Sequence, residues 1–165
     1  MCTTLRRGAH SALVDSVSGG LIAVRERDAV AILDAQGNLV CSFPFAPGEV
    51  TAARLDGGRL VVARRNVIEV YDVSTGAGVL QRPLPSGYEL HDVDGGIAVL
   101  SRNGDARLLR LDDGRSFTLA PGRAPVRADL EAPGLYYAYA TRDGGARVVF
   151  MPRSEVLQKL AGSAR

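Results

Sequence analysis

The sequence predicts an all-β protein built from four consecutive units of about 38 residues. A short turn recurs along the chain at equal steps. An apolar run follows each turn, and a second strand-like run follows each apolar run. An equal period of this length, with the same features in the same order, indicates a repeat architecture.

The recurring turn consists of Gly19-Gly20, Gly57-Gly58, Gly95-Gly96 and Pro133-Gly134, and the second residues of successive turns are 38 apart. Glycine supplies the positive φ that tight hairpins need. The apolar runs that follow the turns span 21–24, 60–63, 97–100 and 135–138. Four residues are too few for a helix, and continuous apolarity indicates a strand that is covered on both faces.

Further strands complete each unit. Second strands are expected at 29–33, 67–71, 106–111 and 146–150, third strands at 39–43, 79–82 and 116–119, and weaker strands before the turns at 12–17, 50–55, 88–93 and 126–130. Asp34, Asp72 and Asp112 follow the first three second strands, where an Asp side chain stabilises a tight turn. Pro-rich connections at 44–48, 83–87 and 121–125 suit the crossing from one sheet to the next, because no ladder hydrogen bond is lost there.

Four strands per unit, joined by short turns, are the plan of a propeller blade. We therefore predict a single domain over 1–165. It is a β-propeller or propeller-like arc of four antiparallel four-stranded blades, at about 12–48, 49–87, 88–125 and 126–160. A β-sandwich also has evenly spaced strands, but it does not give three equal steps with the same turn. The tail at 155–160 is expected to form a helix or a last strand.

The stretch GGRLVVARRNVIEVYDVSTGAGV at 57–79 resembles the blade repeat of the WD40, YVTN and quinoprotein-like propeller superfamilies. The resemblance covers about 12–160. The chain contains no Trp and no Gly-His opening to a repeat, which departs from true WD40 blades and from the Trp docking motif of quinoprotein enzymes. The resemblance implies an architecture and carries over no catalytic residue, because propellers have many unrelated functions.

Composition and motifs argue against several functions. The net charge of +2 is too small to indicate nucleic-acid binding, and no stretch has the length of a transmembrane helix. His10 and His91 are far apart and lack neighbouring ligands of a zinc site, and no G-x-S-x-G motif occurs. We expect no metal, no cofactor and no catalytic residue. Lys159 is the single lysine, and the high Ala, Arg and Gly content is typical of a high-GC bacterial source.

Arginines recur after the first strong strand of every unit: Arg25, Arg27, Arg64, Arg65, Arg102 and Arg142. They fall in the loop after the apolar run of each unit, which is the loop between the second and third strands of a blade when the weaker strand before the turn is counted first. Blade symmetry therefore predicts a ring of arginines on one end of the disc. Such a ring can bind carboxylates, phosphates or an acidic protein surface. The alternative interpretation is that these arginines are solvated turn charges, paired with nearby polar residues such as Asp28 and Asp105.

The sequence favours a non-enzymatic binding or scaffold module, with a protein or anionic ligand on its arginine-bearing face. A hydrolase or lyase stays an alternative, with a central channel near Asp15, His91 and Asp129.

The chain could instead be part of a larger propeller. The first repeat lacks an adapted cap, which predicts self-association or further blades upstream of Met1. As written the chain is expected in the cytoplasm; an upstream start with a signal peptide would mean export.

Overall fold

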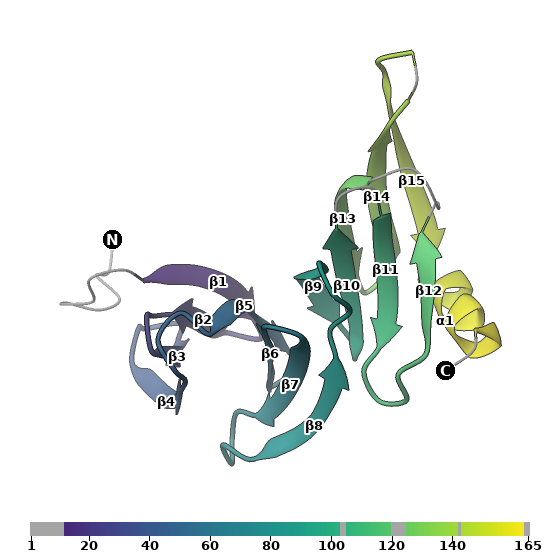
Figure 1. Ribbon diagram of the computed structural model, residues 1–165. Helices are drawn as coiled ribbons and strands as arrows, with labels where there is room; N and C mark the ends of the chain where they lie inside the picture. The colour runs from purple at the N-terminus through teal and green to yellow at the C-terminus, as the bar shows by residue number, and fades with distance from the viewer. Residues whose placement is uncertain (1–11, 103–104, 120–124, 142, 164–165) are drawn as a thin grey trace. The chain divides into compact units, whose positions relative to one another are not determined.

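Fifteen strands and one helix are present among the residues that the computed structural model describes, which are 12–102, 105–119, 125–141 and 143–163 (Figure 1). The strands form four antiparallel sheets, and consecutive strands are neighbours in each sheet. The chain divides into two compact units, Met1–Pro85 and Ser86–Arg165, and each unit holds two sheets. The predicted all-β repeat fold is confirmed, whereas a single domain over 1–165 stays a prediction.

The first unit contains two four-stranded sheets, and β5 of the second sheet packs against β1 and β2 of the first. The first sheet has the order β1 (Leu13–Ser18), β2 (Leu21–Arg25), β3 (Ala29–Asp34) and β4 (Leu39–Pro44). The second sheet has the order β5 (Val50–Asp56), β6 (Arg59–Arg64), β7 (Val67–Asp72) and β8 (Gly78–Pro83). Both sheets lie within the bounds 12–48 and 49–87 expected for the first two blades.

The second unit contains the other two sheets and the helix. The third sheet consists of β9 (Glu89–Asp94), β10 (Ile97–Arg102), β11 (Asp105–Arg110) and β12 (Ser116–Leu119). The fourth sheet consists of β13 (Pro125–Glu131), β14 (Gly134–Ala140) and β15 (Ala146–Pro152), and α1 (Arg153–Gly162) follows it. Among the described residues the fourth sheet therefore has three strands, so the expectation of four strands in every blade is wrong.

The sequence after β15 favours a helix for a physical reason. β15 ends at Pro152, which has no backbone N–H to donate to a ladder. The residues that follow include strong helix formers, and Val156 and Leu160 stand four apart on one helical face. Both side chains are fully buried in the core between the third and fourth sheets.

The three Gly-Gly turns have the predicted role. They join β1 to β2, β5 to β6 and β9 to β10, and both glycines of each turn have positive φ, as at Gly57 (53°) and Gly58 (83°). A residue with a side chain is disfavoured in this left-handed conformation. The glycines therefore let each hairpin close with only two residues.

The fourth turn differs, and its predicted equivalence to the others is wrong. Ala132 and Pro133 form the turn, and Gly134 is the first residue of β14, paired with Glu131. Proline fixes φ near –65°, so it cannot take the first position of a turn in which both φ values are positive. The fourth repeat is consequently one residue out of step. Asp92 pairs with Val99 in the third sheet, and Asp129 pairs with Tyr136 in the fourth.

Asp34 at the end of β3 and Asp72 at the end of β7 stabilise the turns that follow, as predicted. The Asp34 carboxylate accepts hydrogen bonds from the backbone N–H groups of Gln36 and Asn38, and Asp72 accepts one from Thr75. In the third sheet, Asp113 accepts a hydrogen bond from the backbone N–H of Arg115. The hydrogen bonds from Asn38 and Ser74 hold the pKa values of Asp34 and Asp72 below their usual range.

Each unit has its own apolar core between its two sheets. The core of the first unit includes Ala23, Val30 and Ile32 from the first sheet and Leu55 and Leu60 from the second. The core of the second unit is lined by Val99, Ala106 and Leu108 from the third sheet, by Leu130, Leu135 and Met151 from the fourth, and by the two helix residues. Burial of these side chains is the main favourable contribution to the packing of the sheets. Among the described residues, no helix is long and apolar enough to cross a membrane.

Candidate functional site

The predicted arginines lie at the expected turns. Arg25, Arg64 and Arg102 are the last residues of β2, β6 and β10, and Arg27 and Arg65 lie in the connections that follow β2 and β6. Arg142 lies outside the described residues. Since Arg102 belongs to the second unit and the other four to the first, a ring that spans both units stays a prediction.

Arg25 connects the two sheets of the first unit. Its Nε donates to Asp15 Oδ2 at 2.8 Å, and its Nη1 donates to the backbone oxygen of Val50 at 3.1 Å. The same Asp15 oxygen accepts the backbone N–H of Ala53 at 2.9 Å. Asp15, predicted to line a central channel, therefore has a nearly buried side chain whose carboxylate joins β1 to β5. This arrangement favours a structural role for both residues.

Arg64 is held between two carboxylates. Its Nε and Nη2 each donate to Glu69 at 2.7 Å, and its Nη1 lies 2.9 Å from Glu49 Oε1. Glu69 is only 4% exposed and also accepts hydrogen bonds from Tyr71 Oη at 2.6 Å and Gln81 Nε2 at 2.8 Å. We call Arg64, Glu69, Tyr71 and Gln81 the Glu69 cluster.

The Glu69 cluster shifts the ionisation of its members. Burial by itself raises the pKa of the Glu69 carboxyl, but the hydrogen bonds from Arg64, Tyr71 and Gln81 outweigh burial and hold this pKa below its usual range. Burial and the hydrogen bond to Glu69 raise the pKa of Tyr71 to about 12. Glu69 is therefore ionised and Tyr71 neutral around pH 7, which keeps the hydrogen bonds intact.

Arg102 is also engaged within its own sheet. Its Nη2 lies 3.7 Å from Asp105 Oδ2, and its guanidinium stands 4.8 Å from the ring centroid of Tyr88. The hydroxyl of Tyr88 donates to the same Asp105 oxygen. The expected alternative, that turn arginines pair with nearby acidic residues, therefore describes Arg102, which pairs with the Asp105 that the sequence suggested. Arg25 and Arg64 pair instead with carboxylates that the sequence did not suggest as their partners, Asp15 and Glu69.

Arg27 and Arg65 differ from these three residues because both are exposed. Neither has a carboxylate partner among the residues that the structure describes. Arg65 has a φ of 48°, and it is the single residue other than glycine with positive φ in that part of the chain. The Pro-rich connection after β4 lies beside the turn of Arg27, since the backbone N–H of Gly48 donates to the backbone oxygen of Arg27. The first unit thus presents two unpaired guanidinium groups at the turn ends of adjacent sheets.

The structure gives separate surroundings to the residues of the predicted channel. His91 is exposed and lies at a register irregularity of β9, and Asp129 is half-buried on β13. The residues that follow them in sequence are hydrogen-bonded to each other: Asp92 Oδ2 accepts the backbone N–H of Leu130 at 2.9 Å. Within the described ranges, no group of three or more His, Cys, Asp or Glu side chains could hold a metal ion.

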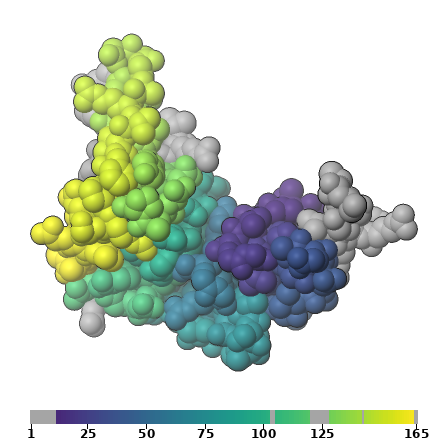
Figure 2. Space-filling model, turned by 180° about the vertical axis from the view of Figure 1, so that it is seen from behind, coloured from purple at the N-terminus to yellow at the C-terminus, as the bar shows by residue number. Residues whose placement is uncertain are grey.

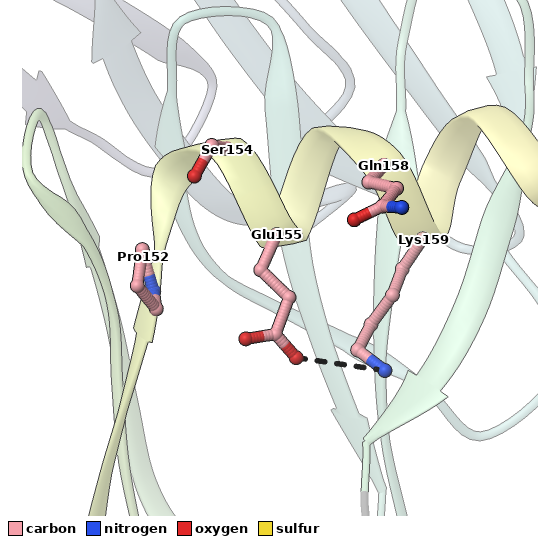
Figure 3. A pocket seen from close by; sticks show the side chains of 5 residues that line it. All are labelled: Pro152, Ser154, Glu155, Gln158 and Lys159. Atoms are coloured by element: carbon pink, nitrogen blue, oxygen red, sulfur yellow. Dashed lines mark ion pairs between the residues drawn. The ribbon is translucent and has the colours of Figure 1, made fainter.

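A shallow hollow lies at the start of α1 (Figure 3). It is lined by Pro152, Ser154, Glu155, Gln158 and Lys159, and Glu155 and Lys159 form an ion pair at 3.6 Å. Pairs of opposite charge four residues apart are common on solvated helix faces. The hollow therefore does not provide a convergent set of catalytic groups.

The sequence pattern predicted the turn arginines but not the carboxylate that binds Arg64. A signal was present in the sequence, because Glu69 interrupts the apolar run from Val67 to Tyr71. A buried charged residue requires a partner, and Arg64 is close in sequence. No comparable feature of the sequence predicted the positive φ of Arg65.

Comparison with solved structures identifies the architecture. The chain is similar to the computationally designed Ika4 protein, with 14% identity and a TM-score of 0.57 over 92% of this chain and 99% of Ika4. It is also similar to Hsv2 from Kluyveromyces marxianus, with 8% identity and a TM-score of 0.63 over 88% of this chain and 50% of Hsv2. The chain has the β-propeller fold.

A third similar structure is a chain in the Saccharomyces cerevisiae complex of Dbp5 bound to Nup159, Gle1, IP6 and ADP. Here the identity is 14% and the TM-score 0.61, over 85% of this chain and 40% of that chain. This propeller chain thus spans half or less of the two yeast chains. No family model and no curated protein matches the sequence. At these identities the likeness shows the fold alone.

Proposed function

We propose that this propeller is a non-enzymatic binding module, and that it binds an acidic segment of a partner protein through the turn end of its first unit. The contact residues are Arg27 and Arg65, which are exposed on adjacent sheets. Arg25 and Arg64 lie beside them but are committed to Asp15 and Glu69. An arginine with a free guanidinium can bind a carboxylate with two parallel hydrogen bonds.

The conformation of Arg65 is the observation that carries this proposal. A residue with a side chain at φ of 48° costs free energy that glycine would not. Residues held in such strained conformations cluster at functional sites. At the tip of a hairpin the Arg65 side chain is exposed and stabilises nothing within the described chain, so we attribute its presence to a partner.

A protein partner fits the other observations better than a nucleic acid. The net charge of the chain is +2, whereas nucleic-acid binding domains carry a strong basic surface. In the matched yeast complex, Dbp5 is bound to Nup159 and Gle1, so a similar fold occurs there in a protein assembly. Two exposed arginines on adjacent sheets suit a short acidic stretch of such a partner.

The test is a titration of the full chain with a fluorescent glutamate-rich peptide at low and high salt. Reversal of both charges, Arg27→Glu with Arg65→Glu, is expected to weaken binding on the order of tenfold or more. Arg147→Glu is the matched control, because Arg147 is exposed on β15 of the other unit. Binding of the wild type should weaken as salt rises, because exposed charges are screened. Equal affinity of the double variant and the control would contradict the proposal.

Arg65→Gly separates binding from stability. Glycine relieves the backbone strain, so the free energy of unfolding should stay the same or rise by about 1 kcal/mol, while peptide binding weakens. Arg64 is unsuitable for this test because its reversal would leave the buried Glu69 without its cation. A variant Arg65→Gly that is less stable than the wild type would show that the arginine serves the fold.

A further inference from the structure

The fourth sheet ends on a strand whose counterparts in the other sheets are inner strands. β3, β7 and β11 each have a neighbouring strand on both sides, whereas β15 is the last strand of its sheet among the described residues. No residue of β3, β7 or β11 is exposed, but five of the seven residues of β15 are. An unpaired strand edge is a template for pairing with another chain. β15 presents such an edge.

Hydrogen bonds at the two ends of β15 show how its backbone is turned. The N–H of Arg153 donates to the backbone oxygen of Pro133, and the backbone oxygen of Gly145 accepts the N–H of Thr141. The register between these ends is regular. Successive residues of an antiparallel strand direct their backbone groups alternately to its two sides. The odd-numbered residues of β15 therefore bind β14, and the even-numbered residues direct their N–H and C=O groups away from it.

We call Ala146, Val148 and Phe150 the open edge, because these even-numbered residues direct both backbone groups away from β14. All three are exposed, Val148 by 76% and Phe150 by 47%. The next even-numbered residue, Pro152, has no N–H. The hairpin of β14 and β15 projects beyond the other strands of its unit in Figures 1 and 2. The open edge is therefore accessible to another strand.

The side chains on this face of the hairpin are uncharged. Strand register pairs the open edge with Tyr136, Ala138 and Ala140 of β14. The rings of Tyr136 and Phe150 pack against each other with centroids 4.8 Å apart, and Tyr136 is 39% exposed. Contiguous exposed apolar side chains favour association. The strand that extends this face should likewise be uncharged on this side, and the open edge itself has that property.

We propose that the open edge pairs with the open edge of a second copy of this chain. The two strands run antiparallel about a two-fold axis at Val148, so that the two copies of Val148 lie opposite each other and Ala146 lies opposite Phe150. The outward N–H and C=O groups of all three residues then meet those of the second copy. A small side chain also lies opposite a large one. Both copies use the same surface, as a two-fold interface requires.

Two neighbouring registers are less favourable. An axis at Val149 places Ala146 opposite Pro152, which has no N–H to donate. An axis at Arg147 places two guanidinium groups directly opposite each other, and like charges in that position are destabilising. The axis at Val148 avoids both disadvantages.

Charge on the other face of the sheet fits the same register. An axis at Val148 places Arg147 of the second copy opposite Val149, in the row that continues to Tyr137. Glu155 of α1 lies near this row, because its charge, after burial and the charge of Tyr139, raises the pKa of Tyr137. The side of the sheet that receives the arginine of the second copy therefore carries a carboxylate.

The experiment is multi-angle light scattering of the full chain over a range of concentrations. The expected result for the wild type is a dimer of twice 17.4 kDa. Val148→Asp and Val148→Lys should each give a folded monomer, since each change places like charges opposite each other at the two-fold axis. Val79→Lys is the matched control, because Val79 is an exposed valine on β8, the last strand of the second sheet. It should leave the dimer intact.

A mixture of the Val148→Asp and Val148→Lys chains tests the register. In the mixed dimer a carboxylate lies opposite an ammonium group, so mixing should restore the mass of a dimer. Val148→Pro is a further variant that should be monomeric, because it removes an N–H of the open edge and leaves the hydrogen bonds to β14 in place. Circular dichroism checks that each variant is folded.

Three results would overturn the proposal. The first is a wild type that stays a monomer at every concentration, which would leave the open edge to a strand of another protein. The second is a Val148→Asp chain that is still a dimer. The third is a pair of folded, monomeric variants that do not associate on mixing.

Discussion

At the scale of single residues, the Glu69 cluster shows how a charge is accommodated inside the second sheet. Taking a carboxylate out of water costs several kcal/mol, and only a close partner with further hydrogen bonds offsets this cost. Glu69 receives two hydrogen bonds from Arg64 and one each from Tyr71 and Gln81. Arg64 and Glu69 therefore stabilise the fold only as a pair.

The cluster predicts a specific pH dependence of stability. The pKa of Glu69 in the folded state is held below its ordinary value of 4.5. Its ionised form therefore contributes stability that is fully present above about pH 4.5 and is lost as the pH falls through the lower folded-state pKa. The free-energy difference between the wild type and Glu69→Gln should be largest near pH 7 and shrink below pH 4.5. Urea unfolding at a series of pH values measures it, and parallel curves for the two proteins would contradict the prediction.

At the scale of elements, the Gly-Gly turns fix the hairpins between the first and second strands. Gly58 has a φ of 83°, and a Cβ built on it meets no atom within 4 Å. A side chain at Gly58 would therefore be disfavoured by the backbone conformation and not by a clash.

Gly58→Val is expected to lower the free energy of unfolding by about 1–3 kcal/mol. Arg27→Ala, a change at an exposed turn residue, should stay within about 0.5 kcal/mol. Thermal unfolding compares the two variants. Equal melting temperatures would mean that the turn does not hold Gly58 in the left-handed conformation.

The fourth sheet shows where a repeat pattern is insufficient to predict an element. The spacing of Pro133-Gly134 matches the other turns, but the fixed φ of proline moves the turn back by one residue. A shift of one residue in a strand exchanges its two faces. Tyr136 therefore takes the position that Val99 has in the third sheet, which the 38-residue step assigned to Tyr137.

At the scale of the whole molecule, the sequence predicted the sheets well and the site only in part. The period located the turns, and with them Arg25, Arg64 and Arg102 at the ends of the second strands. The partners of these arginines depend on which strands lie opposite each other. Arg64 reaches Glu69 across the β6–β7 hairpin, and Arg25 reaches Asp15 across β1 and β2. For Arg25 no local sequence pattern predicts the partner, because Asp15 lies at a register irregularity of β1.

The contact between successive sheets in a unit has a polar part as well as an apolar core. In the first unit, Ser16 accepts the backbone N–H of Leu55, and in the second unit Asp92 accepts that of Leu130. These acceptors hold equivalent positions on β1 and β9. In the second and in the fourth sheet, one backbone N–H of the first strand therefore donates a hydrogen bond to a side chain of the preceding sheet.

The Asp92 contact leads to a prediction about how the third and fourth sheets are held together. Asp92→Ala removes the acceptor and leaves the N–H of Leu130 without it, which costs about 1–3 kcal/mol. Asp92→Asn keeps an acceptor oxygen and should cost less. Glu89→Ala, an exposed change on the same strand, serves as the control and should be near neutral. Denaturant unfolding of the four proteins gives the order of stability. If Asp92→Ala were as stable as Glu89→Ala, the hydrogen bond to Leu130 would not contribute to sheet packing, and the apolar core alone would hold the two sheets together.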